Sequence, residues 1–178
     1  MLEKIESQNI VLQRYSMEDS AAVFHAIKHS YAEISPWLDW LTPHYSLKDA
    51  EKFIKRQIQN WHDGLEYTFA IKNHSGDFLG TIALHIYDRQ NDVASVGYWI
   101  DSRYSGQGNC SQALRLLVNN TLRLLHLIRI EIIVATTNYA SQKVALNAGA
   151  VFEAVLKHRI RINGKATDAN IYAFTQSP

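Results

Sequence analysis

The segment Ser95–Leu114, SVGYWIDSRYSGQGNCSQAL, decides how the rest of the chain is read. It begins as an alternating β-branched and aromatic run, passes through Gly106 and Gly108, and ends in a pattern typical of a helix. Glycines between a strand and a helix let the backbone approach a ligand, and the free N–H groups of a helix N-terminus favour an anion. A diphosphate is the natural ligand, and Arg103 would add positive charge.

Two better-known phosphate-binding motifs do not fit this glycine loop. A P-loop would need a lysine and a serine or threonine after the last glycine, and the chain has Asn109 and Cys110 there. A dinucleotide fingerprint would need a third glycine and a position after the first strand of a βαβ unit. On the glycines alone, a plain turn between strand and helix is an equally good interpretation.

Composition indicates an ordinary globular protein. The chain has 178 residues, 47% of them apolar and 20% charged, with a net charge of +1. That length suits a single domain, 1–178, and the charge gives no reason to expect nucleic acid as a partner. Cys110 is the only cysteine, which excludes an internal disulfide and fits a reducing cytoplasm. The first residues, MLEKIESQNI, do not read as a signal peptide, and no apolar run indicates a membrane span.

Working outward from the segment, the upstream half predicts a strand, two helices and an antiparallel meander. Ser16 with Asp19, and Ser46 with Asp49, have the spacing of capping boxes and predict two helix starts. The predicted strands are residues 10–14, 66–72, 77–87 and 94–100. The segment between the two helices, which includes PWLDW at 36–40, predicts a loop that carries large aromatic side chains.

Downstream of the glycines, the periodicity predicts a helix, a buried strand, a short helix and a hairpin. Asn138 is a candidate N-cap for the short helix, which Gly149 would end. Asn163-Gly164 is a strong signal for a tight turn. The predicted elements are a helix at 114–125, a strand at 129–136, and paired strands at 150–160 and 166–175. The fold class is therefore α+β, built on a mixed sheet.

Together with RIEIIVATTNYASQKVALNAGA at 129–150 and FEAVLK at 152–157, the opening segment resembles the GNAT superfamily of N-acetyltransferases. The most similar group is the RimJ/RimL type, which acetylates the N-termini of ribosomal proteins. The resemblance implies a seven-strand mixed sheet with about four helices, splayed open where the strands at 96–100 and 129–135 lie side by side. It also implies acetyl-CoA as the acetyl donor. No metal ion is expected, because His25 and His29, which have the i, i+4 spacing of metal ligands, lack a nearby third ligand. Related enzymes often form homodimers, although nothing in this sequence indicates an interface.

The same resemblance assigns the CoA-binding residues. The diphosphate would be held by backbone N–H groups of the glycine loop, and the pantetheine arm would follow the backbone of the strand before it. The residues implied are Trp99, Ile100, Arg103, Tyr104, Ser105, Gly106, Gln107, Gly108, Asn109, Asn138 and Ser141.

Two of these residues are implied to take part near the reacting thioester. By resemblance, Asn138 hydrogen-bonds the pantetheine, and Ser141 places its hydroxyl near the CoA sulfur as a general acid. Their residue types also favour a capping role at the start of the short helix. The two roles are compatible, and we expect both.

The general base does not follow from the resemblance, because two carboxylates found in relatives are replaced here by Ser95 and Ile160. An α-amino group, with a pKa of about 7.7–8.0, is partly neutral at pH 7, so that deprotonation through water is one alternative. Among side chains, His85 is the first candidate base, since its strand adjoins the proposed cleft. A merely packed or exposed histidine is the competing interpretation. Glu33, Asp39 and His44 are further candidates.

The acceptor cannot be read from the residues. By resemblance, Trp37 and Trp40 are substrate-side residues, and the preferred acceptor is a protein or peptide N-terminus, such as that of a ribosomal protein. Small amines, polyamines and amino-bearing antibiotics are alternatives. A catalytically inactive acyl-CoA-binding module is another, as the missing carboxylates suggest.

Cys110 offers a different route, a covalent acetyl-cysteine. Thiol pKa values fall at helix N-termini, which is where this cysteine is predicted to lie. A small residue packed into the core is the simpler interpretation, and the resemblance implies direct transfer.

Overall fold

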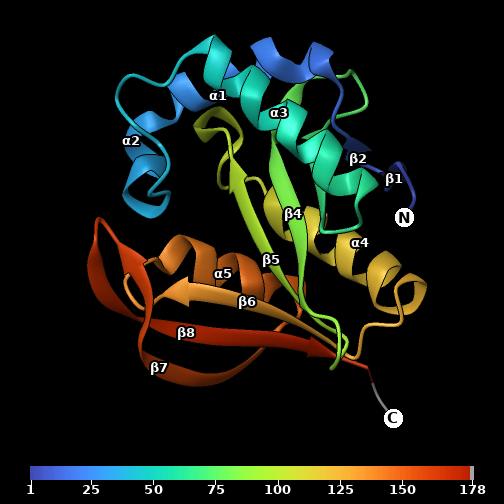
Figure 1. Ribbon diagram of the computed structural model, residues 1–178, viewed down its shortest axis with the longest axis vertical. Helices are drawn as coiled ribbons and strands as arrows, with labels where there is room; N and C mark the ends of the chain where they lie inside the picture. Colours follow the sequence, from blue (N-terminus) through green and yellow to red (C-terminus); the bar gives the residue numbers. More distant parts are fainter. Residues whose placement is uncertain (177–178) are drawn as a thin grey trace.

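Within residues 1–176, which the computed structural model describes, eight strands form one mixed sheet (Figure 1). Their order across the sheet is β1-β2-β3-β4-β5-β6-β8-β7. All neighbours are antiparallel except β5 and β6, which run parallel. The strands are β1 (Lys4–Glu6), β2 (Val11–Arg14), β3 (Glu66–Lys72), β4 (Phe78–Asp88), β5 (Val93–Ile100), β6 (Arg129–Ala135), β7 (Val151–Ile162) and β8 (Lys165–Thr175).

Five α-helices are described, with three short 3₁₀ turns. They are α1 (Ser20–His29), α2 (Tyr31–Ile34), α3 (Leu47–His62), α4 (Asn109–Leu124) and α5 (Tyr139–Ala148), with η1 (Met17–Asp19), η2 (Ser35–Trp37) and η3 (Ser102–Tyr104). Both predicted capping boxes are present: Asp49 accepts from the amide of Ser46 at 3.1 Å, and Asp19 accepts from that of Ser16 at 2.9 Å. No helix in this part of the chain is long and apolar enough to cross a membrane.

The helices cover the two faces of the sheet and enclose two apolar clusters. Helices α4 and α5 pack on one face, where Leu114 and Leu117 are buried with Ile82 and Ile130. Helices α1 and α3 pack on the other, where Ile27 and Ile54 belong to the second cluster. The alternation of side chains along each strand accounts for this division, since successive residues point to opposite faces.

The sheet opens between β5 and β6, as the resemblance predicts. These strands pair only at Val93–Arg129, Ala94–Ile130 and Ser95–Glu131. Beyond Ser95 they separate, and Figure 1 shows them as the two arms of a V. The C-terminal part of β5 therefore has backbone groups with no partner strand on that side, which a ligand is free to use.

The α+β class and the splayed mixed sheet are confirmed, but the predicted number of strands is one short. The missing strand, β1, is only three residues long, and Ile5 is its one buried residue, so it is too short for its alternation to be recognised in the sequence. The aromatic segment predicted to be a loop contains α2 and η2. Both are single turns, too short to display helical periodicity.

The predicted C-terminal hairpin is present and reaches across the open end of the V. Asn163 and Gly164, at its tip, have φ angles of 50° and 73°, as a type I′ turn requires. The amide of Asn163 donates to the carboxylate of Asp39 at 2.9 Å. The tip of the hairpin is thereby joined to the segment that follows η2.

Candidate active site

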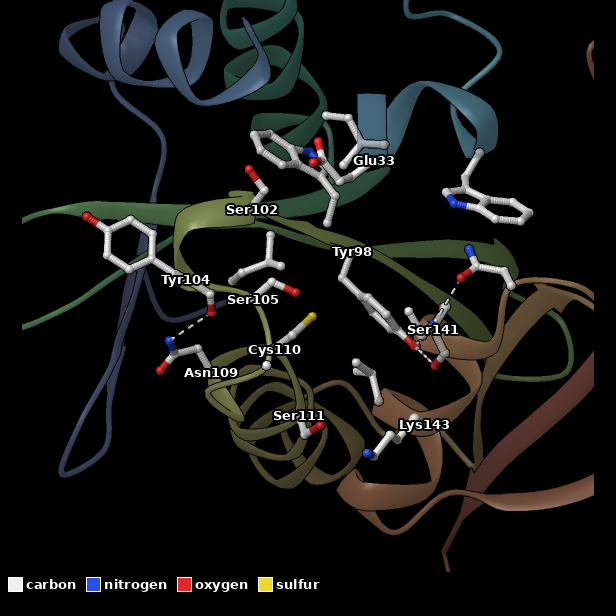
Figure 2. A pocket seen from close by; sticks show the side chains of 18 of the residues that line it. Glu33, Tyr98, Ser102, Tyr104, Ser105, Asn109, Cys110, Ser111, Ser141 and Lys143 are labelled. Atoms are coloured by element: carbon white, nitrogen blue, oxygen red, sulfur yellow. Dashed lines mark hydrogen bonds between the residues drawn. The ribbon is translucent and has the colours of Figure 1, made fainter. Parts of the chain in front are cut away.

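A cavity of about 510 Å³ lies where β5 has parted from β6 (Figure 2). Four parts of the chain meet around it: the α2–η2 segment, the end of β5, the glycine loop with the start of α4, and the first turns of α5. The lining residues are Glu33, Ile34, Trp37, Leu38, Tyr98, Trp99, Ile100, Ser102, Tyr104, Ser105, Gly106, Gly108, Asn109, Cys110, Ser111, Asn138, Ala140, Ser141, Lys143, Val144 and Asn147.

The glycine loop presents free backbone donors to this cavity. Among residues 1–176, none accepts a hydrogen bond from the amides of residues 106–111; the next amide, that of Gln112, donates to the Gly108 carbonyl at 3.0 Å. Gly106 and Gly108 have φ angles of 74° and 82°, and no atom lies within 4 Å of where a Cβ on either would stand. The positive φ explains why glycine is favoured there, and the open space leaves the amides accessible to an anion.

Arg103, expected to add charge to this loop, pairs with Asp101 instead, although 49% of its side chain remains exposed. Its Nε donates to both carboxylate oxygens of Asp101, at 3.1 Å each. Burial acts to raise the pKa of Asp101, but the hydrogen bonds from Arg103 outweigh it and hold that pKa below its usual range. Arg103 is not among the cavity-lining residues, because its guanidinium compensates a fully buried carboxylate.

Asn138 and Ser141 lie together at the start of α5, and both line the cavity. The side-chain oxygen of Asn138 accepts from the amide of Ser141 at 3.1 Å, so the predicted cap is present. The capping oxygen belongs to Asn138 alone, and Ser141 contributes only its amide to the cap. The hydroxyl of Ser141 is therefore free for another role.

That hydroxyl contacts Tyr98, which was not among the predicted site residues. Ser141 Oγ donates to the hydroxyl of Tyr98 at 3.2 Å, and the Tyr98 hydroxyl donates to the Ser141 carbonyl at 3.0 Å (Figure 2). Burial raises the pKa of Tyr98, so its phenol keeps its proton at any physiological pH. The cavity thus contains two neutral hydroxyl groups that are hydrogen-bonded to each other.

Of the other predicted site residues, some line the cavity and some do not. Trp37, Trp99, Ile100, Tyr104, Ser105 and Asn109 do. Gln107 is exposed, and the Nε2 of its side chain donates to the Arg103 carbonyl at 3.3 Å. Trp40 stacks on Phe53 of α3, with ring centroids 6.2 Å apart, so that it packs on the helix rather than in the cavity. His85 lies on β4, outside the lining, with its Nδ1 at 3.5 Å from Glu66.

Cys110 lines the cavity but is unsuited to covalent catalysis. Its side chain is buried, and burial raises the pKa of its thiol to about 12. Because the nucleophile is the thiolate, a thiol that stays protonated at neutral pH is unreactive. The structure agrees with the simpler interpretation, a small buried residue.

Several residues that line the cavity were not predicted from the sequence, although the spacing of some of them could have indicated it. Ala140, Val144 and Asn147 recur at helical intervals and so share one face of α5, a signal that periodicity carries. Tyr98 alternates with Trp99 along β5, so the two point to opposite faces of the sheet. Ile34 offers no such signal, because α2 is a single turn. Glu33, which was among the candidate bases, does line the cavity.

Comparison with known proteins decides what this arrangement is. Residues 9–151 match the family model described as an acetyltransferase (GNAT) domain. The chain belongs to the GNAT acetyltransferase family. It is 30% identical to the ribosomal-protein-serine acetyltransferase of Escherichia coli over 136 residues, which are 76% of this chain and 75% of that protein.

Solved GNAT structures agree in fold. RimL, a ribosomal-protein α-N-acetyltransferase solved in complex with coenzyme A, superposes with a TM-score of 0.89 at 25% identity, covering 97% of this chain and 98% of that one. MccE, a microcin self-immunity acetyltransferase solved with acetyl-CoA and AMP, has the same TM-score at 22% identity, over 96% and 94% of the two chains. This GNAT chain is an acetyl-CoA-dependent N-acetyltransferase, related to the enzymes that acetylate ribosomal-protein N-termini.

The residues at the cavity fit acetyl-CoA. The unpaired amides of residues 106–111 suit a diphosphate. Trp99 and Ile100 lie on the part of β5 that has no partner strand toward β6, where a pantetheine arm with its amides could take the place of a strand. Bound there, acetyl-CoA supplies the acetyl group as a thioester.

Proposed function

We propose that this GNAT enzyme acetylates the α-amino group of a protein or peptide N-terminus, with a ribosomal protein as the model acceptor. The observation that carries the proposal is the 30% identity to the ribosomal-protein-serine acetyltransferase over three quarters of both chains. A ribosomal-protein acceptor also implies that the enzyme acts in the cytoplasm.

The cavity agrees with an extended acceptor. Trp37 and Glu33 stand on its α2–η2 side, where an aromatic surface and a carboxylate suit a peptide backbone and its terminal ammonium group. Trp40, packed on Phe53, has no part in this proposal.

We assign the donor side as follows. The amides of residues 106–111 hold the diphosphate, Trp99 and Ile100 hold the pantetheine through their backbone, and Asn138 hydrogen-bonds it while capping α5. Ser141 gives its hydroxyl proton to the departing sulfur and takes up the proton that leaves the attacking nitrogen, while its hydroxyl is hydrogen-bonded to that of Tyr98. A thiolate with a conjugate pKa near 8.5 is already a good leaving group, so this proton assists the reaction rather than making it possible.

We further propose that residues 1–178 act as one catalytic domain. The family model ends at residue 151, yet β8, beyond that point, pairs with β6 along seven residues from Arg129 to Ala135. The hairpin therefore completes the sheet and is required for the same fold.

The test is an acetylation assay with matched acceptors. The enzyme and acetyl-CoA are incubated with short peptides that carry a free N-terminal serine, with the same peptides blocked at the N-terminus but containing lysine, and with polyamines and amino sugars. Thiol release and product mass are followed. We expect the free N-terminal peptides to be acetylated and the blocked ones not. Turnover of only the small amines, or acetyl-CoA binding with no turnover at all, would overturn the proposal.

A further inference from the structure

Four polar side chains form a row across the sheet at the level where the V begins. Glu66 on β3 pairs with His85 on β4, His85 with Ser95 on β5, and Ser95 with Glu131 on β6. Residues paired across neighbouring strands point to the same face of a sheet. Ser95 and Glu131 are the last pair that joins β5 to β6, so the row ends where the cleft starts.

Within this row, the two ring nitrogens of His85 have different surroundings. Nδ1 faces the carboxylate of Glu66, and Nε2 faces β5. Its Nδ1 lies 3.5 Å from a carboxylate oxygen of Glu66. Its Nε2 lies 3.7 Å from the position that a Cβ on Gly97 would occupy. Because Gly97 carries no side chain, the imidazole reaches across to β5, two residues before the cavity-lining Trp99. No residue between 1 and 176 hydrogen-bonds this Nε2.

Glu66 is itself fixed by a buried polar network. Its carboxylate accepts from the Thr68 hydroxyl at 2.8 Å and from the Asn60 amide at 3.2 Å. The side-chain amide of Gln57 satisfies both its oxygen and its nitrogen only when these two atoms are exchanged. In that orientation its nitrogen donates to the two carboxylate oxygens of Glu66, at 3.1 and 3.2 Å. Burial acts to raise the pKa of Glu66. The hydrogen bonds from His85, Thr68 and Asn60 outweigh burial and leave that pKa below its usual value, so the carboxylate stays ionised. A fixed, ionised carboxylate keeps the proton of a neutral imidazole on Nδ1 and leaves a lone pair on Nε2.

Glu131, at the other end of the row, is not equivalent. One of its oxygens accepts from Nε of Arg129 at 2.6 Å, and the other accepts from the Tyr87 hydroxyl at 2.8 Å. With both oxygens engaged, its carboxylate is a weaker proton acceptor than a free imidazole nitrogen. On β5, His85 lies opposite Ser95 and beside Gly97, and neither of these residues carries a charge.

We propose that Glu66 and His85 form the general-base pair of this enzyme: Nε2 of His85 takes a proton from the acceptor ammonium group, and Glu66 positions the imidazole. The neutral amine then forms its bond to the thioester carbonyl carbon as the carbon–sulfur bond breaks. The second proton leaves the nitrogen and reaches the sulfur by way of the Ser141 hydroxyl, which gives the free thiol. The imidazolium returns its proton to water. The proposal rests on the proposed function only in requiring an amine acceptor.

The test compares His85→Gln and Glu66→Gln with a matched control, His62→Gln. His62 also lies beside a carboxylate, with Nδ1 at 3.4 Å from Asp63, but its side chain is 81% exposed. The assay uses whichever amine the wild type acetylates fastest, so a wrong acceptor class would overturn the proposed function without affecting this result. Melting temperature and acetyl-CoA affinity are measured for each variant.

We expect His85→Gln to lower kcat by roughly a hundredfold near pH 6.5, with acetyl-CoA affinity unchanged. The loss should shrink above the pKa of the acceptor amine, which is about 7.7–8.0 for an α-amino group, because the acceptor is then already neutral. Glu66→Gln should show a smaller loss with the same pH dependence, and the double variant should be no worse than His85→Gln alone. Three results would overturn the proposal that Glu66 and His85 act as a general-base pair. These are a loss of kcat that does not change with pH, losses in the two single variants that add up in the double variant, and a His85→Gln variant as active as His62→Gln.

Discussion

The hydroxyl of Ser141 donates to the hydroxyl of Tyr98 at 3.2 Å, although the two residues are 43 positions apart in the chain. The contact joins the start of α5 to the arm of β5, across the corner where the cavity opens. It means that the proposed proton donor to the CoA sulfur is part of a pair and does not act alone.

We expect Ser141→Ala to lower kcat by roughly ten- to a thousandfold, while KM for acetyl-CoA changes less, because Asn138 and the loop amides are retained. Since the cap oxygen is that of Asn138, the variant should keep its cap and lose at most about 1 kcal/mol of unfolding free energy for the missing hydroxyl. Single-turnover kinetics at saturating acetyl-CoA checks this. A variant as fast as wild type would show that the thiolate leaves unassisted.

Tyr98→Phe extends that experiment to the second hydroxyl. If the two groups act as a unit, the single losses in kcat should not multiply in the double variant, which should be about as slow as Ser141→Ala. A double-mutant cycle on kcat measures the coupling. Strictly multiplicative losses would show that Tyr98 only packs beside Ser141.

Gly106→Val and Gly108→Val should weaken acetyl-CoA binding by about tenfold or more, because the new side chain stands in the space before the free amides. Each also incurs roughly 1–2 kcal/mol of strain at its positive φ. Gly76→Val is the matched control: its φ is 90°, nothing lies within 4 Å of a Cβ there, and it does not line the cavity.

The control should lose similar stability and keep its acetyl-CoA affinity, as measured by calorimetry and thermal melting. In wild type, acetyl-CoA at a hundredfold excess over its dissociation constant should add about 2.7 kcal/mol of unfolding free energy. Loop variants that bind as tightly as the control would show that the two glycines serve the turn alone.

Asn138→Ala should both destabilise the fold and weaken acetyl-CoA binding. Loss of the cap on the Ser141 amide is expected to cost about 1 kcal/mol of unfolding free energy. Ser46→Ala removes an equivalent cap, on the Asp49 amide of α3, away from the cavity. Only the Asn138 variant should also lose affinity for acetyl-CoA. Equal acetyl-CoA affinities in the two variants would show that Asn138 only caps α5.

Arg103→Gln should act on stability and hardly on acetyl-CoA binding. It leaves the buried carboxylate of Asp101 without its partner, which we expect to cost about 1–3 kcal/mol of unfolding free energy at pH 7. The pKa of Asp101 is lowered in the folded protein, so its contribution is present above the unfolded pKa, near 3.9, and is lost as pH falls through the folded value.

Denaturant titrations from pH 7 to pH 3 should therefore show the gap between wild type and Arg103→Gln closing below about pH 4. Lys157→Ala is the comparison, since it breaks an ion pair with Asp168 in which the lysine is 81% exposed, and such pairs contribute little. A large loss of acetyl-CoA affinity in folded Arg103→Gln would contradict this structural role of Arg103 and indicate that the arginine binds the CoA diphosphate.

The sequence predicted best what local chemistry determines. The caps at Ser46 and Asn138 and the turn at Asn163-Gly164 depend on residues within a few positions of each other, and all three are present. The glycine loop was predicted for the same reason. A resemblance to a known family was needed to place the opening between β5 and β6, because strand pairing is a long-range property.

The parts that sequence could not supply are contacts between distant segments. Arg103 was expected to face a phosphate because its partner Asp101, only two residues away, gave no sign of being fully buried. Nothing in the sequence pairs Tyr98 with Ser141, or Glu66 with His85, since those contacts exist only after the strands and helices have packed. Trp40 matched a family motif, yet its ring stacks on Phe53 of α3 while the residue stays 48% exposed, a contact with a distant segment that the loop sequence does not indicate.

The hydrogen bond from Asn163 to Asp39 has a topological consequence. It connects the tip of the β7–β8 hairpin, on the β6 side of the V, to the segment that follows η2, which lies 124 positions away in the chain. The positions of these two segments are therefore coupled through one exposed hydrogen bond of 2.9 Å.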